Sequence, residues 1–252
     1  MNKNVSFRPL IIAHRGASNE APENTLKAFQ KAIELEADCI EFDVQRTKDG
    51  EIVIMHDNNT LRTTGHFGLI SRMKLSELKE LDCGEGEKIP TLEELFQIAK
   101  GKICLNCEIK ARGLTAKLIE LLQESDMVEQ TIISSFKRDV LLEIQNTNSK
   151  IKLASLEPTR TGWIRSWLSR KELLRVAVER NFYAINPFHK LVTPTFVEKA
   201  HKNNIKIFPW TVNSESRIKK LVQLGVDGII TNHVSRAKDV LVNLLNDSNE
   251  LN

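Results

Sequence analysis

Short apolar segments rich in β-branched residues alternate with amphipathic segments along almost the whole chain, and this alternation constrains the fold more than any other feature. Most of the apolar segments are bounded by polar or turn-forming residues, as parallel strands covered on both faces should be. We predict strands at Leu10–Ala13, Cys39–Val44, Ile52–Met55, Ile103–Ile109, Thr131–Ser134, Lys152–Leu156, Tyr183–Asn186, Ile205–Trp210 and Gly228–Thr231.

The amphipathic segments between these strands predict helices, and several of them carry helix-end signals. Thr91 and Glu94 match a capping box, Pro194 stands at a first helical position, and Gly225 is suited to end a helix. The predicted helices are Thr25–Leu35, Thr91–Ala99, Leu114–Gln123, Arg138–Gln145, Lys171–Arg180, Pro194–Lys202, Ser214–Leu224 and Ser235–Leu245.

Alternating strands and helices over 252 residues are typical of a (β/α)₈ barrel. One strand is in excess, and the segment Gln45–Glu51 between the second and third strands is too short for a helical crossover, so it predicts a hairpin. A turn centred between Lys48 and Asp49 sets the expected register. The expected cross-strand pairs are Asp43 with Ile54 and Glu41 with His56.

The segment after the hairpin is the second irregular feature. Residues 57–89 are largely polar and contain one weak helical pattern, Ser76–Leu81. A segment of this length without a strand is typical of an insertion or a lid. We therefore predict an α/β fold, a (β/α)₈ TIM barrel with a small insertion after the third strand. Residues 1–252 are expected to form one domain, with the inserted segment at about 57–89.

The charge and hydropathy of the chain argue against several classes of partner. The net charge of +3 and the pI of about 8.6 come with scattered basic residues, which does not favour nucleic-acid binding. No apolar stretch approaches the ~20 residues of a membrane span, and Met1–Leu10 lacks the apolar region of a signal peptide. We therefore expect a cytoplasmic protein that does not bind nucleic acid.

The four cysteines are spaced too irregularly for a disulfide scaffold. Cys104 and Cys107 lie three residues apart on a predicted strand, so their side chains should point to opposite faces. We therefore expect them to form neither a metal site nor a disulfide.

Three acidic residues on two predicted strands suggest a metal site. Glu41 and Asp43 share one face of their strand, and in a confined site their charges would repel each other unless a divalent cation relieved the repulsion. Glu108 shares a strand face with Lys110 and can supply a third carboxylate. Three oxygen ligands suit Mg²⁺ or Ca²⁺ better than zinc. The alternative is a pair of surface acids on an edge strand.

Two histidines and two cationic side chains lie near the predicted metal ligands. His14 and His56 each end a predicted strand, and the C-terminal strand ends of a barrel carry the catalytic groups of such enzymes. An ordinary histidine pKa of about 6.5 suits one acid and one base. Arg15 offers a planar fork for a phosphate and Lys110 a compact charge, and Gly16 lets the chain turn there. This set of groups predicts a site for a phosphate diester.

The segment APENT, residues Ala21–Thr25, is interpreted mainly as the start of the first helix. Glu23 would be favourable near the positive end of that helix. A contact between Asn24 and the site is the alternative.

At this point the residues resemble the glycerophosphodiester phosphodiesterase family over nearly the whole chain, from Ile12 to about Asn232. The first matching stretches together are highly specific, whereas PTLEEL and GVDGIIT alone occur in many α/β barrels. The matching stretches, in family order, are AHRGAS, APENT, EFDVQRTKDGEIVIMHD, IPTLEEL, CEIK, SSF, PWTVN and GVDGIITN.

The resemblance implies a (β/α)₈ barrel with a small inserted segment. It implies a small-molecule substrate, a glycerophosphodiester, which is hydrolysed to glycerol 3-phosphate and an alcohol. It also implies Mg²⁺ or Ca²⁺ as the cofactor. Trp210 looks like the family's pocket-wall aromatic, with ordinary core or rim packing as the alternative. The implied roles are acid–base catalysis by His14 and His56, phosphate binding by Arg15 and Lys110, and metal binding by Glu41, Asp43 and Glu108.

Two other functions stay open. A lysophospholipase D-type or phosphoinositide-type phosphodiesterase would act on lipid at a membrane surface, and one helical face is spaced for such contact. The simpler interpretation is a helix packed on the barrel, so membrane contact is not favoured. A non-catalytic binding protein is less expected, because no predicted ligand or histidine is missing. The residues of that apolar face are Trp163, Ile164, Trp167 and Leu168.

Overall fold

The strands form one sheet that curves into a nearly closed barrel. This computed structural model describes residues 8–158 and 170–249. Within them, eight strands follow the order β8-β7-β6-β5-β4-β2-β1-β9, with parallel ladders, and β3 pairs antiparallel with β2. The strands are β1 Leu10–His14, β2 Cys39–Arg46, β3 Ile52–Ile54, β4 Cys104–Ile109, β5 Thr131–Ser135, β6 Lys152–Glu157, β7 Ala184–Pro187, β8 Lys206–Ile207 and β9 Gly228–Thr231.

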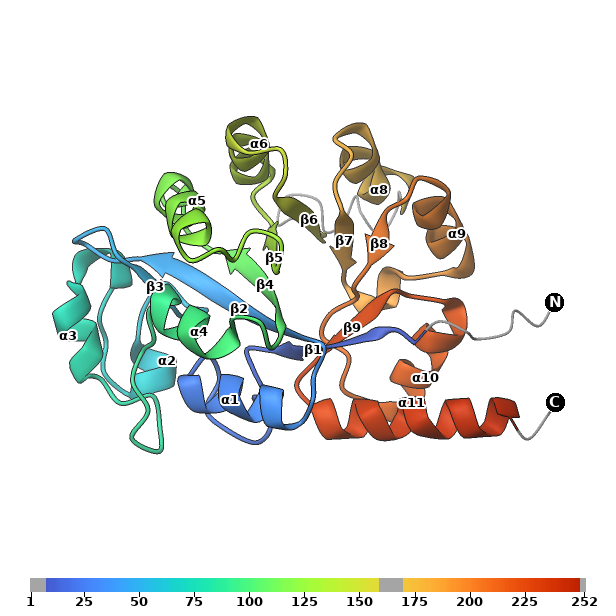
Figure 1. Cartoon of the computed structure of the whole chain (residues 1–252), viewed down its shortest axis with the longest axis horizontal. Helices are drawn as coiled ribbons and strands as arrows, with labels where there is room; N and C mark the ends of the chain where they lie inside the picture. Colours follow the sequence, from blue (N-terminus) through green and yellow to red (C-terminus); the bar gives the residue numbers. More distant parts are fainter. Residues whose placement is uncertain (1–7, 159–169, 250–252) are drawn as a thin grey trace.

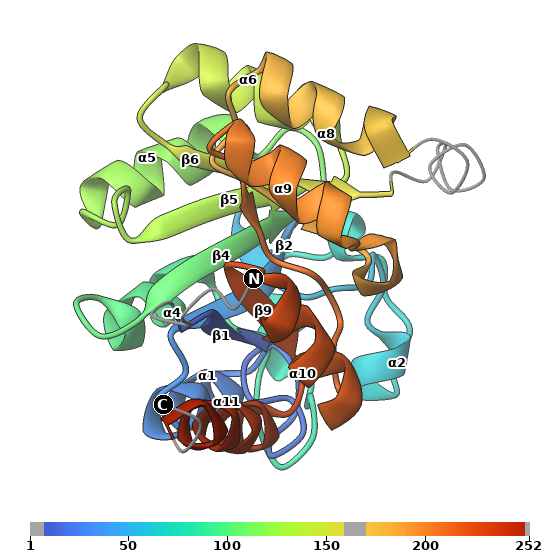
Figure 2. The same cartoon turned by 90° about the vertical axis from the view of Figure 1, so that its right-hand side faces the viewer.

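Helices pack around the outside of these strands, as Figures 1 and 2 show from two directions. This arrangement confirms the predicted (β/α)₈ barrel. The α-helices are α1 Leu26–Glu34, α2 Leu61–Thr64, α3 Leu75–Glu80, α4 Leu92–Ala99, α5 Thr115–Glu124, α6 Arg138–Thr147, α8 Arg170–Glu179, α9 Pro194–Lys202, α10 Glu215–Leu224 and α11 Val234–Asn249. Two short 3₁₀ helices are η1 Ile70–Arg72 and η2 His189–Leu191.

Backbone hydrogen bonds bring β8 and β9 together and nearly close the barrel. Asp227 N donates to Ile207 O over 3.1 Å, and Ile230 N donates to Pro209 O over 3.0 Å. β8 is shorter than the predicted strand, because Pro209 has no amide hydrogen to donate to a ladder. The closure therefore rests on a few bonds rather than on a continuous ladder.

The hairpin between β2 and β3 is present, but its predicted register is wrong by one residue. Val44, rather than Asp43, lies opposite Ile54. By the same shift Glu41 does not pair with His56, which follows the end of β3. A shift of one residue exchanges the two faces of a strand. Val44 and Ile54 accordingly both pack in the outer core.

The turn geometry explains this difference in register. Thr47 N donates to Glu51 O over 3.0 Å, and Gly50 adopts a left-handed φ of 91°. The loop therefore has an odd number of residues and is centred on Asp49. Because the sequence pattern does not reveal the loop type, the prediction placed the centre between two residues.

The chain between β3 and α4 contains α2, η1 and α3, and it lies at one side of the barrel beside β3 (Figure 1). The observed α3 begins one residue before the predicted pattern. A small apolar cluster separate from the main core supports this segment. The buried members of that cluster are Val53, Met55, Ile70, Leu78, Cys83 and Ile89.

The alternation of side chains along the strands produces two main apolar layers. Outward-facing strand side chains pack under the helices in the largest cluster. This cluster includes Phe42 of β2, Phe29 of α1 and Leu118 of α5. Inward-facing side chains fill the barrel itself. The buried members of this inner cluster are Ile12, Cys39, Ile132, Ala154, Ala184, Phe208 and Ile230.

The cysteines follow the same alternation. Cys107 packs in the outer cluster and Cys104 against the inner one, so the two side chains point to opposite faces as predicted. Cys39 lies opposite Cys104 on the neighbouring strand, with the two sulfur atoms 2.8 Å apart, a pairing that the strand pattern did not predict. The four cysteines are free thiols.

The predicted membrane-surface face stays a prediction. Trp163, Ile164, Trp167 and Leu168 lie outside the described residues. Among the helices within residues 8–158 and 170–249, none has the length and apolar character needed to cross a bilayer.

Candidate active site

A cavity of about 220 Å³ opens at the C-terminal ends of the barrel strands. Its lining includes both predicted catalytic histidines, both predicted phosphate-binding cations and Trp210. Glu41 and Glu108 also line it, whereas Asp43 is buried, only 1% exposed. The structure therefore brings the predicted site residues together around one cavity, although they come from distant parts of the chain.

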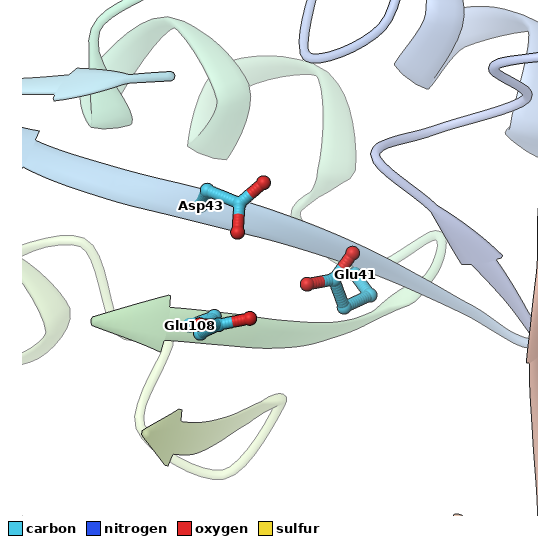
Figure 3. A group of neighbouring side chains, drawn as sticks. All are labelled: Glu41, Asp43 and Glu108. Carbon is cyan, nitrogen blue, oxygen red and sulfur yellow. The ribbon is translucent and has the colours of Figure 1, made fainter. Parts of the chain in front are cut away.

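The three predicted metal ligands form a compact buried cluster. Glu41 and Asp43 lie on β2 and Glu108 on the neighbouring β4, and Figure 3 shows the three side chains close to one another on these two strands. The parallel register places Asp43 opposite Glu108. Each residue offers an oxygen within 4.8 Å of those of the other two. The alternative interpretation as surface acids on an edge strand is wrong, because β2 is paired on both sides.

Burial and mutual repulsion raise the pKa of two of these carboxyls. Burial, followed by the charges of Asp43 and Glu108, raises the pKa of Glu41 well above its ordinary value. Burial is also the main reason that the pKa of Glu108 is raised to about 7. For Asp43 burial acts in the same direction, but Lys110 and Arg15 outweigh it and hold the pKa at about 2. The cluster thus concentrates more negative charge than its cationic neighbours compensate.

Arg15 and Lys110 hold the acidic cluster from the side of the cavity. Lys110 Nζ lies 3.0 Å from Asp43 Oδ1 and also forms a short ion pair with Glu108. Arg15 Nε lies 3.3 Å from Asp43 Oδ2, and the backbone nitrogen of Arg15 donates to Glu41 over 3.1 Å. These two cations contact the carboxylates on one side and border the open cavity on the other, so they are well placed to bind an anionic ligand.

His14 ends β1 with its imidazole held in one tautomer. Its Nδ1 lies 2.6 Å from the side-chain oxygen of Asn232. Because an amide oxygen only accepts hydrogen bonds, Nδ1 carries the proton and Nε2 keeps its lone pair. This Nε2 lies 3.9 Å from Glu41. Burial, helped by the charge of Arg15, lowers the pKa of His14 to about 4, so the ring is neutral at neutral pH.

His56, just after β3, has a different partner. Its Nδ1 donates to Asp57 Oδ1 over 2.6 Å, and Asp57 Oδ2 accepts from Arg62 Nε over 2.6 Å. Burial, with Lys110 and Arg15, lowers the pKa of His56, while Asp57 acts in the opposite direction. A carboxylate on Nδ1 stabilises the protonated ring, and an amide does so much less. The two histidines are therefore chemically unequal.

Several supporting contacts were missed or left open by sequence reasoning. Asn24 does reach the site: its Nδ2 donates to Asp43 over 2.9 Å. Glu23 accepts from Arg15 over 2.9 Å and from Arg62 over 2.6 Å, so it joins the first loop to the segment after β3. The contact between His56 and Asp57 could have been predicted, because an acidic residue directly follows the histidine in the sequence. No sequence signal indicated that Asn232 meets His14, because 218 residues separate them.

The loop after β1 depends on a glycine that touches the first helix. Gly16 has a φ of 79°, and a Cβ built there would lie 2.7–2.8 Å from the backbone of Ala28. The nitrogen of the next residue, Ala17, donates to Ala28 O over 2.9 Å. The left-handed conformation and the close approach together require glycine at this turn.

Replacing Gly16 by alanine is therefore expected to lower the free energy of unfolding by about 2–4 kcal/mol, since backbone strain and a steric clash add. Gly86→Ala is the matched control: its φ is 80°, but a Cβ would meet no atom of the described residues within 4 Å. Chemical denaturation of both variants measures the difference. Equal losses for the two variants would show that the contact with Ala28 contributes nothing.

Trp210 forms part of an aromatic wall of the cavity. Its ring packs edge to face on Phe136 with centroids 5.5 Å apart, and its Nε1 donates to Asn186 O over 2.8 Å. It also contacts Phe188 at 5.7 Å. Trp210 is thus both a lining residue and a packed one, so the two interpretations of its role do not exclude each other.

Sequence comparison finds relatives over nearly the whole chain. The sequence model of the "Glycerophosphoryl diester phosphodiesterase family" matches residues 14–236. A glycerophosphodiester phosphodiesterase from Caldanaerobacter subterraneus subsp. tengcongensis is 38% identical over 252 residues, an alignment that covers 95% of this chain and 98% of that protein. The residues matched by the family model therefore include every predicted site residue.

Solved structures give the same result for the fold. Glycerophosphodiester phosphodiesterase from Thermotoga maritima is 30% identical with a TM-score of 0.79, and the match covers 94% of this chain and 98% of the other. A phosphodiesterase from Oleispira antarctica, solved in complex with the product sn-glycerol-3-phosphate, is 27% identical with a TM-score of 0.78 and coverages of 93% and 97%.

Proposed function

The chain belongs to the glycerophosphoryl diester phosphodiesterase family and hydrolyses glycerophosphodiesters to glycerol 3-phosphate, and we propose that His14 and His56 are its acid–base pair. The proposal assigns metal binding to the acidic cluster, and phosphate binding to Arg15 and Lys110. The observation that carries it is the convergence of two histidines, two cations and two carboxylates on one cavity, with the carboxylate of Asp43 buried beside them.

A hard divalent cation, Mg²⁺ or Ca²⁺, fits the acidic cluster. Glu41 supports this fit most directly, because burial and like charge raise its pKa well above the ordinary value and a cation would remove that cost. All three side chains offer oxygen ligands, which these ions prefer. When bound, the ion supplies positive charge that stabilises negative charge developing on the phosphate oxygens.

The unequal partners of the histidines support unequal roles. His14 is neutral and has a free Nε2, so we assign it as the base. Asp43 and Asp57 oppose the lowering of the His56 pKa, and Asp57 stabilises the protonated ring through Nδ1, so we assign His56, entering the reaction in its protonated form, as the acid. In this assignment Asn232 and Asp57 orient the two rings.

The proposed reaction has two steps. His14 Nε2 takes the proton of the glycerol 2-hydroxyl as its oxygen attacks phosphorus, and His56 gives its Nε2 proton to the departing alcohol as the bond from phosphorus to that oxygen breaks. A cyclic phosphate results, while Arg15 and Lys110 hold the phosphate oxygens. Water then opens the ring: His56 takes a proton from water, and His14 returns its proton to the 2-oxygen. Glycerol 3-phosphate is released, and both histidines return to their starting states.

Release of glycerol 3-phosphate from glycerophosphocholine tests the proposal. Chelator-treated protein is expected to release almost none, and added Mg²⁺ or Ca²⁺ is expected to restore release. Full turnover in the presence of chelator would contradict the metal-dependent mechanism. No turnover with either ion would contradict the choice of Mg²⁺ or Ca²⁺ as the cofactor.

A further inference from the structure

One side of the cavity carries polar groups that neither the metal ligands nor the phosphate-binding cations use. Ser134 of β5 and Asn186 of β7 line the cavity, and each is 1% exposed. Within the described part of the chain, Ser134 Oγ and both side-chain amide atoms of Asn186 lack hydrogen-bond partners. Because a buried polar group without a partner is costly, these atoms are suited to meet a polar ligand in the cavity.

The strand register relates these groups to the catalytic centre. Ser134 lies opposite Glu108 on the ladder between β4 and β5. Asn186 lies opposite Leu156, another lining residue, on the ladder between β6 and β7. Since neighbouring strands are about 4.8 Å apart, the Ser134 hydroxyl lies one strand away from a predicted metal ligand. Asn186 extends the polar surface further round the same cavity.

The aromatic wall adjoins these polar groups. Trp210 donates from Nε1 to the backbone oxygen of Asn186 and packs on Phe136, the second residue after Ser134. Lys110 Nζ lies 5.9 Å from the Phe136 ring centroid. The wall therefore begins beside a phosphate-binding cation and continues to the unpaired amide. Aromatic faces cover C–H groups, while an amide and a hydroxyl bind a substrate hydroxyl.

On the basis of the proposed function, we infer that Ser134 and Asn186 bind the terminal hydroxyl of the substrate's glycerol group. The 2-hydroxyl must lie at His14 and phosphorus in order to react, so the terminal carbon is the part of glycerol that is free to reach this wall. A substrate without that hydroxyl leaves the buried groups unpaired. An acyl group on that oxygen removes the hydrogen and adds bulk, so the same contacts select deacylated substrates.

A neighbouring strand offers a matched control for Ser134. Ser155 of β6 is also 1% exposed, and its hydroxyl likewise lacks a partner within the described residues. Its chain neighbour Ala154 packs inside the barrel, so alternation directs Ser155 outward, toward the helices. A Ser155→Ala variant therefore removes a comparable buried hydroxyl away from the cavity.

The test compares glycerophosphocholine with 2-hydroxypropyl phosphocholine, which keeps the attacking hydroxyl and lacks the terminal one. We expect wild-type kcat/KM to favour glycerophosphocholine by roughly 10- to 100-fold. Ser134→Ala and Asn186→Ala should each reduce this preference, by slowing glycerophosphocholine while leaving the analogue nearly unchanged. Ser155→Ala should keep the wild-type preference. Thermal denaturation checks that each variant is folded. If Asn186→Ala does not fold, the substrate preference of Ser134→Ala alone tests the inference.

Two results would overturn this inference but not the proposed function. One is a wild-type ratio of the two kcat/KM values near one, and the other is variants that slow both substrates equally. The second result would assign Ser134 and Asn186 a structural role. Failure of the wild-type protein to hydrolyse glycerophosphocholine with any divalent ion would overturn the proposed function together with the inference. The two failures are therefore distinguishable in one experiment.

Discussion

Replacing His56 by glutamine is expected to lower kcat for glycerophosphocholine by about 10²–10⁴-fold, the usual contribution of a positioned acid or base. In the first turnover of p-nitrophenyl glycerophosphate, release of p-nitrophenolate by the same variant should be impaired far less, because p-nitrophenolate leaves phosphorus without a proton from the enzyme and His56 is needed only later, to open the cyclic phosphate. His14→Gln should slow both substrates, since the attacking hydroxyl still needs a base. Single-turnover rates of alcohol release from the two substrates thus separate the acid, which Asp57 supports, from the base, which Asn232 supports.

His66→Gln is the matched control, because His66 is exposed and does not line the cavity. It should turn over both substrates at the wild-type rate. If His14→Gln, rather than His56→Gln, recovers on the p-nitrophenyl substrate, the two roles are reversed. If both variants keep near-normal turnover of glycerophosphocholine, neither histidine acts as acid or base.

The second large effect is expected at the acidic cluster. Glu41→Gln should lower metal-supported turnover on the order of 10³-fold, because a charged ligand of the proposed ion is lost. Wild-type protein should gain about 5 °C or more in Tm at an ion concentration 100-fold above the dissociation constant. The variant should lose most of this gain. Differential scanning fluorimetry with chelator, Mg²⁺ and Ca²⁺ measures the shift independently of activity.

The ion-free protein provides a second readout for Glu41. Neighbouring carboxylates and burial raise the pKa of this side chain, so neutral glutamine should leave the ion-free Tm unchanged or raise it. Glu85→Gln, at an exposed carboxylate paired with Lys27, serves as the control and should keep the full ion-dependent gain. An equal gain in Glu41→Gln and wild-type protein would exclude Glu41 as a ligand.

Much of the site could be predicted from strand periodicity. Alternation alone placed Glu41 and Asp43 on one face, and the barrel hypothesis let Glu108 supply a third carboxylate from a second strand. The structure then showed that this strand is the neighbour of β2. The same reasoning separated Cys104 from Cys107. These predictions succeeded because the side-chain period of a strand is a local property, and because parallel strands bring their carboxyl ends to one edge.

The register of the hairpin and the supporting contacts could not be predicted in this way. Whether Asp43 or Val44 lies opposite Ile54 depends on the hydrogen bonds of a turn, and several turn types suit the same residues. The partners of the histidines depend on the closure of the whole barrel. Asn232 and His14 meet only because the last strand, β9, pairs with the first.

The sequence by itself determined which side chains share a strand face, where most helices and strands lie, and the chemical character of the site. These properties follow from local periodicity and end signals. The tertiary structure alone decided which groups became partners, such as Asn24 with Asp43 and Glu23 with Arg62. It also placed the amide of Asn186 at the cavity with no hydrogen-bond partner among the described residues. Such partnerships depend on the packing of segments that are distant in the sequence, and no local pattern encodes that packing.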